Sequence, residues 1–522
     1  MNADNLSTML RVQWRTGWKV LLAWVLTQVL MMAMTVSAMQ STYNTPELVA
    51  GYRESIGEGP AMHMMNGRTA GLDTMGGIVA NEFGFIVSFV LPLMGIALVS
   101  RSTRREEEAG RQELLLASSI GRHAPLVAAL LMAGGATLVM ALGCWATGLP
   151  TGVDRVGMLW YVAGCSGIVL FFAGIAAVAA QLFENNRGVW MTGLVVALLA
   201  MIVRGIGAVN DAWYGLLSPL GLMDGIRSFG EPRAWPLLVL LVEAVVLMAV
   251  AMVLNTRRDL GGAVFRSGAG PRQASRALRT PWGLAFFEHR GGLVGWVLGG
   301  MVIMAIYGSL AQPIMDALES NEQLQVYVRA ALDAVLAMFV MMAAMLAAGA
   351  AIAMTGPLAA DESTGRLEVL LSGPRGRRPW LARHLVVVSA GALVVLLVGG
   401  ATLAATASWS LGNDSALTDV LRGSVAQIPA VLAFSGLALC LWACVPRLRS
   451  LAWALFGASF FIGYMGEALR FPAWLVDNSP FLLAGQVPVE PVDWTGVAIL
   501  SVVAVVTHVL ALVGLGRRDI PR

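Results

Sequence analysis

Two stretches of charged and apolar residues are the strongest candidates for function in this sequence. The first, at 106–116, reads EEEAGRQELLL, and the second, at 361–371, reads DESTGRLEVLL; six positions are identical. In each stretch a glutamate precedes an arginine by four residues, the favourable order for an ion pair on a helix, at Glu107 with Arg111 and at Glu362 with Arg366. The leucines that follow predict a short amphipathic helix whose charges, Glu107 and Glu362 among them, face water. For one copy alone an ordinary solvated loop helix is an equal alternative, but two equivalent copies favour a docking site for a symmetric partner.

The residues needed for catalysis are missing. A P-loop needs a lysine after glycine and before serine or threonine, and the only lysine, in Gly17-Trp18-Lys19-Val20, does not fit. The five histidines are scattered without a metal-binding spacing. The sequence therefore predicts no catalytic residues, no metal and no cofactor in this chain, and a net charge of +3 gives no nucleic-acid signal.

The composition indicates which elements must position the charged stretches. Of 522 residues, 57% are hydrophobic and 13% charged, which excludes a soluble enzyme of this size. We expect an all-α polytopic membrane protein with twelve transmembrane helices. The expected spans lie near 18–39, 78–100, 124–148, 157–182, 188–208, 234–255, 292–313, 331–356, 383–408, 421–445, 449–468 and 494–515.

The distribution of basic residues gives the orientation. Most of the 35 lysines and arginines fall in segments that are cytoplasmic if the N-terminus is inside. The expected location is thus the bacterial plasma membrane, with both termini cytoplasmic. The apolar run after Arg11, Arg15 and Lys19 lacks a convincing cleavage site and is interpreted as a retained anchor.

A long basic segment at 256–291 divides the chain into a first half at 1–255 and a second half at 292–522. Six spans in each half predict two parallel six-helix repeats. Besides the charged stretches, Trp213 and Ser218-Pro219 match Trp474 and Ser479-Pro480, and Arg257-Arg258-Asp259 matches Arg517-Arg518-Asp519. Three matches in order, at nearly constant spacing, indicate a tandem duplication.

Several residues outside the charged stretches are candidates for the transport pathway. Glu243, Glu467 and His508 lie in or near spans, where ionisable groups are either substrate or proton contacts or interhelical hydrogen bonds. Glu82 and Arg204, near outer span ends, are explained by snorkelling. The apolar external segments 209–233 and 469–493 predict short re-entrant or interfacial helices that close an outer gate, with Trp213, Pro219, Trp474 and Pro480 as its residues.

The repeated pattern of acids, Gly, Glu and Leu-Leu between the second and third spans resembles the coupling-helix region of ABC-2-type permeases, which carries a pattern like E-E-x-G-T-x-E-x-L-L. The chain departs from it at Arg111 and Arg366, where Thr is commoner. Two fused halves resemble most the polyketide-antibiotic exporter group. In that family an amphipathic helix precedes each half, and residues 5–18 and 278–290 fit such interfacial helices.

The resemblance implies the permease subunit of an ATP-driven exporter of hydrophobic or amphipathic compounds, either polyketide-like drugs or lipids. ATP and Mg would be bound by two copies of a separate ABC ATP-binding subunit. The residues that would couple to it are Glu106, Glu107, Gly110, Arg111, Glu113, Asp361, Glu362, Gly365, Arg366 and Glu368. The alternatives are a proton-driven twelve-span multidrug transporter, which should carry a basic motif where this loop is acidic, and a membrane transferase, which needs acidic or histidine clusters.

Overall fold

The computed structural model describes residues 5–53, 63–64, 66–117, 120–259, 261–265, 273–319, 328–372, 376–412, 414–466 and 471–519. Over these residues the chain is α-helical with short 3₁₀ turns and forms no strand beyond one isolated bridge between Phe183 and Phe265. Eleven of the described helices are long and apolar enough to cross a membrane. The predicted class, an all-α polytopic membrane protein, is confirmed.

The chain divides into two compact units, Met1–Ala269 and Gly270–Arg522, with the boundary inside the basic segment 256–291. The long helices of the first unit are α1 (Leu6–Thr42), α4 (Met75–Ser102), α7 (Ala124–Gly148), α8 (Arg155–Leu182), α9 (Asn186–Val209) and α11 (Ala234–Arg257). Those of the second unit are α12 (Pro281–Ser309), α14 (Val328–Ala353), α17 (Arg377–Leu411), α19 (Ile428–Cys444), α20 (Leu451–Met465) and α22 (Trp494–Arg517).

The predicted span at 449–468 corresponds to α20, which has 15 residues. At 1.5 Å per residue α20 is about 22 Å long, less than the roughly 30 Å of a bilayer's hydrocarbon core. It is not among the eleven candidate spans, whereas α19, with 17 residues, is counted within the longer span Ala416–Cys444, and the count of twelve stays a prediction.

The long helices begin where side chains can accept the free N–H groups of a first turn. Thr74 caps α4, Asp154 caps α8 and Asn185 caps α9, each accepting a hydrogen bond from a backbone N–H two or three residues ahead. In the second unit Thr280 and Asp493 cap α12 and α22 in the same way.

The two units pair their helices in the same order along the chain. In the first unit α1 packs on α7, and α8 packs on both α4 and α11. In the second unit α12 packs on α17, and α19 packs on both α14 and α22. Small residues allow the close approach: a side chain at Gly174 would collide with α11, and one at Gly436 with α22.

Burial differs between the long helices. The span that contains α14 is 78% buried, whereas that of α11 is 17% buried and presents side chains such as Val242 and Val245 at the surface. Because exposed apolar side chains of this extent are unfavourable in water, the weakly buried helices indicate contact with lipid.

The predicted interfacial helices are not separate elements. Residues 6–18 continue without a break into α1, because no proline interrupts the run up to Thr42. Of residues 278–290, the part from Pro281 onward belongs to α12. With 37 residues, α1 is longer than a bilayer core requires, so that one end extends beyond it.

Candidate functional site

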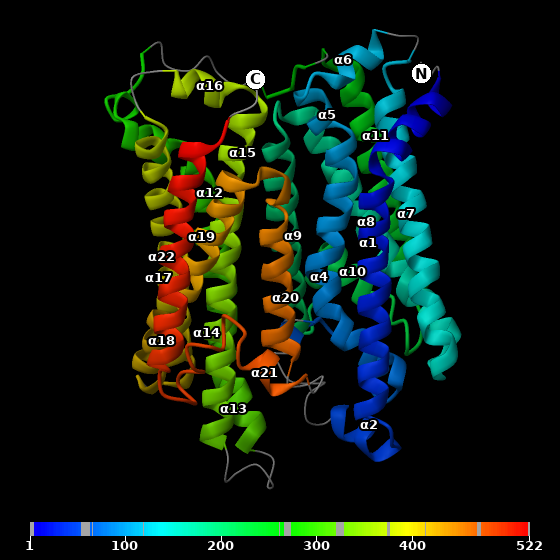
Figure 1. Ribbon diagram of the computed structural model, residues 1–522. Helices are drawn as coiled ribbons and strands as arrows, with labels where there is room; N and C mark the ends of the chain where they lie inside the picture. The colour runs from blue at the N-terminus through cyan, green and yellow to red at the C-terminus, as the bar shows by residue number, and fades with distance from the viewer. Residues whose placement is uncertain are drawn as a thin grey trace. The chain divides into compact units, whose positions relative to one another are not determined.

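Each charged stretch forms two short helices rather than the predicted single one. In the first unit these are α5 (Arg104–Glu108) and α6 (Arg111–Leu116), at the end where the N-terminus lies (Figure 1). In the second unit they are α15 (Gly356–Ser363) and α16 (Arg366–Leu371). Gly110, with φ 68°, and Gly365, with φ 74°, break the helices because they adopt the left-handed conformation.

The break changes the ion pairs. The sequence predicted pairs of Glu107 with Arg111 and of Glu362 with Arg366, but a left-handed residue between them destroys the i, i+4 register. Arg111 instead donates two hydrogen bonds of 2.7 Å to Glu106. Arg366 lies 2.9 Å from Asp361. The predicted pairing is therefore wrong in both units.

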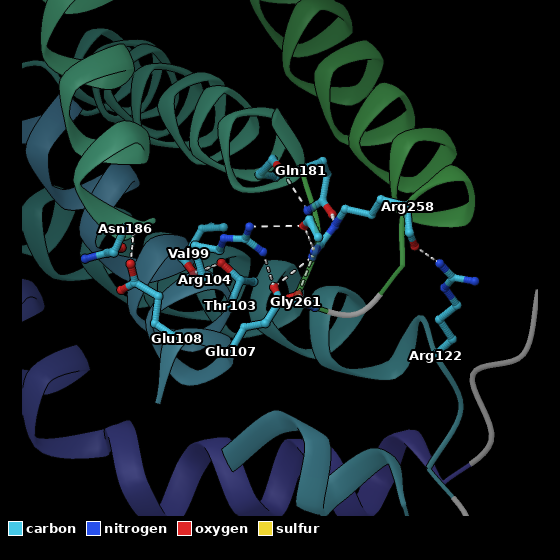
Figure 2. Close-up of polar contacts among 12 residues, drawn as sticks. Val99, Thr103, Arg104, Glu107, Glu108, Arg122, Gln181, Asn186, Arg258 and Gly261 are labelled. Atoms are coloured by element: carbon cyan, nitrogen blue, oxygen red, sulfur yellow. Dashed lines mark hydrogen bonds and ion pairs between the residues drawn. The ribbon is translucent and has the colours of Figure 1, made fainter. Parts of the chain in front are cut away.

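Glu107 points into the protein and not toward water, contrary to the prediction (Figure 2). Its side chain is 3% exposed and lies 2.8 Å from Nη1 of Arg104. Arg258, just after α11, donates hydrogen bonds of 2.6 and 2.8 Å to the two carboxylate oxygens, and the backbone N–H of Gly261 donates another of 2.8 Å. Two cations and a backbone donor thus offset the cost of burying this carboxylate.

Arg258 is itself held from several sides (Figure 2). Its Nε donates to Gln181 at the end of α8 over 2.6 Å, and its backbone carbonyl accepts a hydrogen bond from Arg122. Because α5, α8 and α11 meet at this one guanidinium, Arg258 fixes α5 to the transmembrane helices.

The second unit contains a related arrangement in which the glutamate pairs with a single arginine among the described residues, and Ala359 stands at the position that matches Arg104. Glu362 forms an ion pair with Arg518, just after α22. Arg518 donates to the backbone oxygen of Trp442 over 2.9 Å, and its own carbonyl accepts from Arg377 over 2.6 Å. Burial lowers the pKa of the Arg518 guanidinium below its ordinary value. Glu362 is about one-sixth exposed at 16%, so it too departs from the predicted water-facing position.

The outer sides of α6 and α16 are alike. Gln112 and Leu367 face inward, whereas the residues on either side of them face outward. We call these two exposed sets the docking faces. They consist of Arg111, Glu113 and Leu114 on α6, and of Arg366, Glu368 and Val369 on α16. Leu114 is 76% exposed and Val369 is 75% exposed, each directly after a glutamate. The two units therefore expose a glutamate followed by a large aliphatic side chain at equivalent positions.

The two predicted pathway residues that the structure describes, Glu243 and His508, lie in different units. Glu243 lies half-buried in α11. His508 of α22 lies 3.0 Å from the hydroxyl of Ser389, which also contacts Ser435, so this histidine takes part in interhelical hydrogen bonds. Glu467 lies outside the described residues.

The predicted gate segments contain short helices. In the first unit a 3₁₀ turn at Trp213–Leu217 precedes α10 (Pro219–Gly225), and in the second α21 (Ala473–Val476) is a single turn. Ser218 donates to the carbonyl of Ala200 and Ser479 to that of Ser459, and both serines are buried. Pro219 is buried and Pro480 half-buried, whereas Trp213 and Trp474 are 73% and 69% exposed.

Two features of the site were missed by sequence reasoning. Arg258 and Arg518 were recognised only as repeat markers, although their recurrence after the last span of each half was a signal that they pair with the recurring glutamates.

Arg204 does not snorkel: it is 2% exposed and lies 3.9 Å from Asp224 of α10. Glu82 accepts a 2.6 Å hydrogen bond from Tyr52.

Eleven apolar helices among the described residues, organised in two units with a pair of short charged helices in each, define a multi-pass membrane protein. The chain belongs to the family described as multidrug efflux system permease Rv1217c, C-terminal domain, whose model matches residues 6–254 and 278–515. It is similar to the multidrug efflux system permease protein Rv1217c of Mycobacterium tuberculosis (strain ATCC 25618 / H37Rv). The two are 30% identical over 500 residues, which cover 93% of this chain and 89% of that protein.

Proposed function

We propose that this chain is the membrane-spanning permease subunit of an ATP-driven exporter of hydrophobic or amphipathic compounds. The observation that carries the proposal is the pair of docking faces, which present glutamate followed by an exposed aliphatic residue at equivalent places in both units. The family's description as multidrug efflux permeases supports export of drug-like cargo. The charged stretches support the ABC-2 polyketide-exporter type of permease.

The partner in this proposal is an ABC ATP-binding subunit, one copy on each docking face. The partner would bind ATP and Mg, since the chain's single lysine does not lie in a P-loop. The docking faces are then cytoplasmic, as are both termini. The buried ion pairs under α5 and α15 support this role, because a rigidly attached helix can transmit a push from a partner to the helices behind it.

The experiment tests docking with variants that leave the buried ion pairs intact. We expect the chain, expressed with a candidate ABC ATP-binding subunit from the same organism, to form a one-to-two complex by native mass spectrometry. Leu114→Asp and Val369→Asp should each remove one copy of the ATP-binding subunit from the complex. The double variant should lose both copies and should no longer export drug. The matched control is Leu448→Asp, an exposed leucine after α19 that lies on neither docking face.

The proposal fails if the double variant exports drug normally, or if Leu448→Asp is equally damaging. Normal efflux without a bound ATPase would favour the proton-driven alternative, with Glu243 and Glu467 as the residues to replace next.

A further inference from the structure

The first unit contains a cavity of about 540 Å³ that the proposed function does not use. It lies between the end of α9, the 3₁₀ turn at Trp213–Leu217, α10 and the segment before α4. Asn186, the first residue of α9, is hydrogen-bonded to Glu108 of α5. The other end of α9, and with it the cavity, therefore lies about 36 Å away from α5, at the far end of the unit.

Three arginines and two aspartates line this cavity. Arg68 lies 2.7 Å from Asp211 and also donates to the carbonyl of Ala208. Arg204 is buried and lies 3.9 Å from Asp224. Arg227 is exposed, has φ 55°, and forms no ion pair with another of the described residues. Three guanidinium groups against at most two carboxylates leave at least one positive charge in excess.

The fold itself does not require these charges. The repeated serines align the two segments, because Ser218 contacts the carbonyl of Ala200 in α9 and Ser479 that of Ser459 in α20. In this alignment the second unit has Gly463 at the position of Arg204. With Ser218 aligned to Ser479, the second unit has Gly485 at the position of Asp224 and Pro488 at the position of Arg227. Because burying an arginine is costly and the second unit folds without one, Arg204 needs a reason other than stability.

The cavity wall is apolar next to the arginines. Trp213, 73% exposed, and Leu216 line it on one side, together with the small residues Gly207 and Gly221. An apolar surface beside an excess of guanidinium groups fits a molecule with both a hydrocarbon part and an anionic group, since arginine binds phosphate and carboxylate bidentately.

We propose that this far-end cavity binds the phosphate or carboxylate group of an anionic amphiphile, with Arg204 at its base, Arg68 and Arg227 at its rim and Trp213 against the hydrocarbon part. The source of the amphiphile is either a membrane lipid or a molecule in transit. The site exists in the first unit alone among the described residues, so the two halves differ in what they bind at this end. The inference does not depend on what energises the permease.

Binding of radiolabelled dodecyl phosphate to the full-length chain in neutral detergent tests the proposal. We expect saturable binding that is weakened about tenfold or more by Arg204→Gln, since a charge-assisted hydrogen bond contributes roughly 1.5–3 kcal/mol. Arg204→Lys should retain part of the affinity. Arg227→Gln, at an exposed position that tolerates substitution, should weaken binding without loss of folding. The matched control is Arg233→Gln, an exposed arginine at the same end that does not line the cavity.

Competitors identify the source. Nanodiscs of phosphatidylglycerol that compete where phosphatidylcholine does not would assign the site to a lipid headgroup, and lack of competition would assign it to a molecule in transit. Inorganic phosphate should compete only weakly, because it lacks the hydrocarbon part. Equal binding by wild type, Arg204→Gln and Arg227→Gln would overturn the proposal, as would equal affinity for cationic dodecyltrimethylammonium.

Discussion

Arg258 binds Glu107 through both of its Nη atoms, at 2.6 and 2.8 Å, across 151 residues of sequence. The pair joins the last helix of the first unit to the short helix after α4, and Arg518 joins α22 to α15 through Glu362 in the second unit. Two of the three repeated sequence motifs are therefore the two halves of one interaction. This explains why both recur in each half.

The buried pair should matter for stability far more than the surface pair beside it. We expect Glu107→Ala to lower the free energy of unfolding by about 3–5 kcal/mol, because it leaves Arg104 and Arg258 buried without their partner. Glu106→Ala, whose ion pair with Arg111 is half exposed, should cost about 1 kcal/mol or less. Denaturant titration in detergent measures both, and equal losses would contradict the assignment of Glu107 as the buried anchor.

The helix break at Gly110 and Gly365 should be sensitive to an added methyl group although there is space for one. Nothing lies within 4 Å of a Cβ at either position, so the cost of Gly110→Ala or Gly365→Ala comes from the left-handed backbone alone, about 1–2 kcal/mol. Gly134→Ala in the middle of α7, where space is equally open, should instead stabilise by about 0.5–1 kcal/mol. Opposite signs in thermal unfolding are the expected result; the same sign at both places would refute the argument.

Asp224 should make stability depend on pH. Burial raises the pKa of its carboxyl to about 7, against the opposing effects of Arg204 of α9 and the backbone of Arg68, with Tyr161 of α8 close by. The folded state then holds a proton that the unfolded state has lost, so the free energy of unfolding falls as pH rises from about 4 to about 7. Asp224→Asn should lack this fall. A pH-independent difference between the two proteins would show that the carboxyl is ionised throughout.

The orientation can be read from cysteine labelling in intact cells. Cys444 is exposed, so the background variant is Cys444→Ser. In it, Trp213→Cys at the far end of the first unit should react with a membrane-impermeant maleimide, and Glu113→Cys on the docking face should react only after the membrane is broken. Labelling of Glu113→Cys in intact cells would reverse the predicted cytoplasmic placement of the docking faces.

Sequence reasoning found the membrane class, the long helices and the charged stretches, because apolar run length and local charge patterns are properties of neighbouring residues. It failed where partners are distant. Helical spacing alone predicted that Glu107 pairs with Arg111. Its actual partner is Arg258, because α11 ends beside α5. Arg204 was predicted at the surface for the same reason. It is buried because α10 packs against α9, and the hydrophobic periodicity of neither segment predicts that contact.

The hydrogen bond from the Asn186 backbone N–H to Glu108 ties the start of α9 to α5, and the last turns of that same helix hold Arg204. A helix of 24 residues is a stiff rod, so its two ends cannot move independently. Under the two proposals, a partner that shifts α5 is expected to shift Arg204 relative to the other arginines of the far-end cavity. By reciprocity, an anion held in that cavity would then change how firmly the partner is bound, with α9 as the thermodynamic link between the two surfaces.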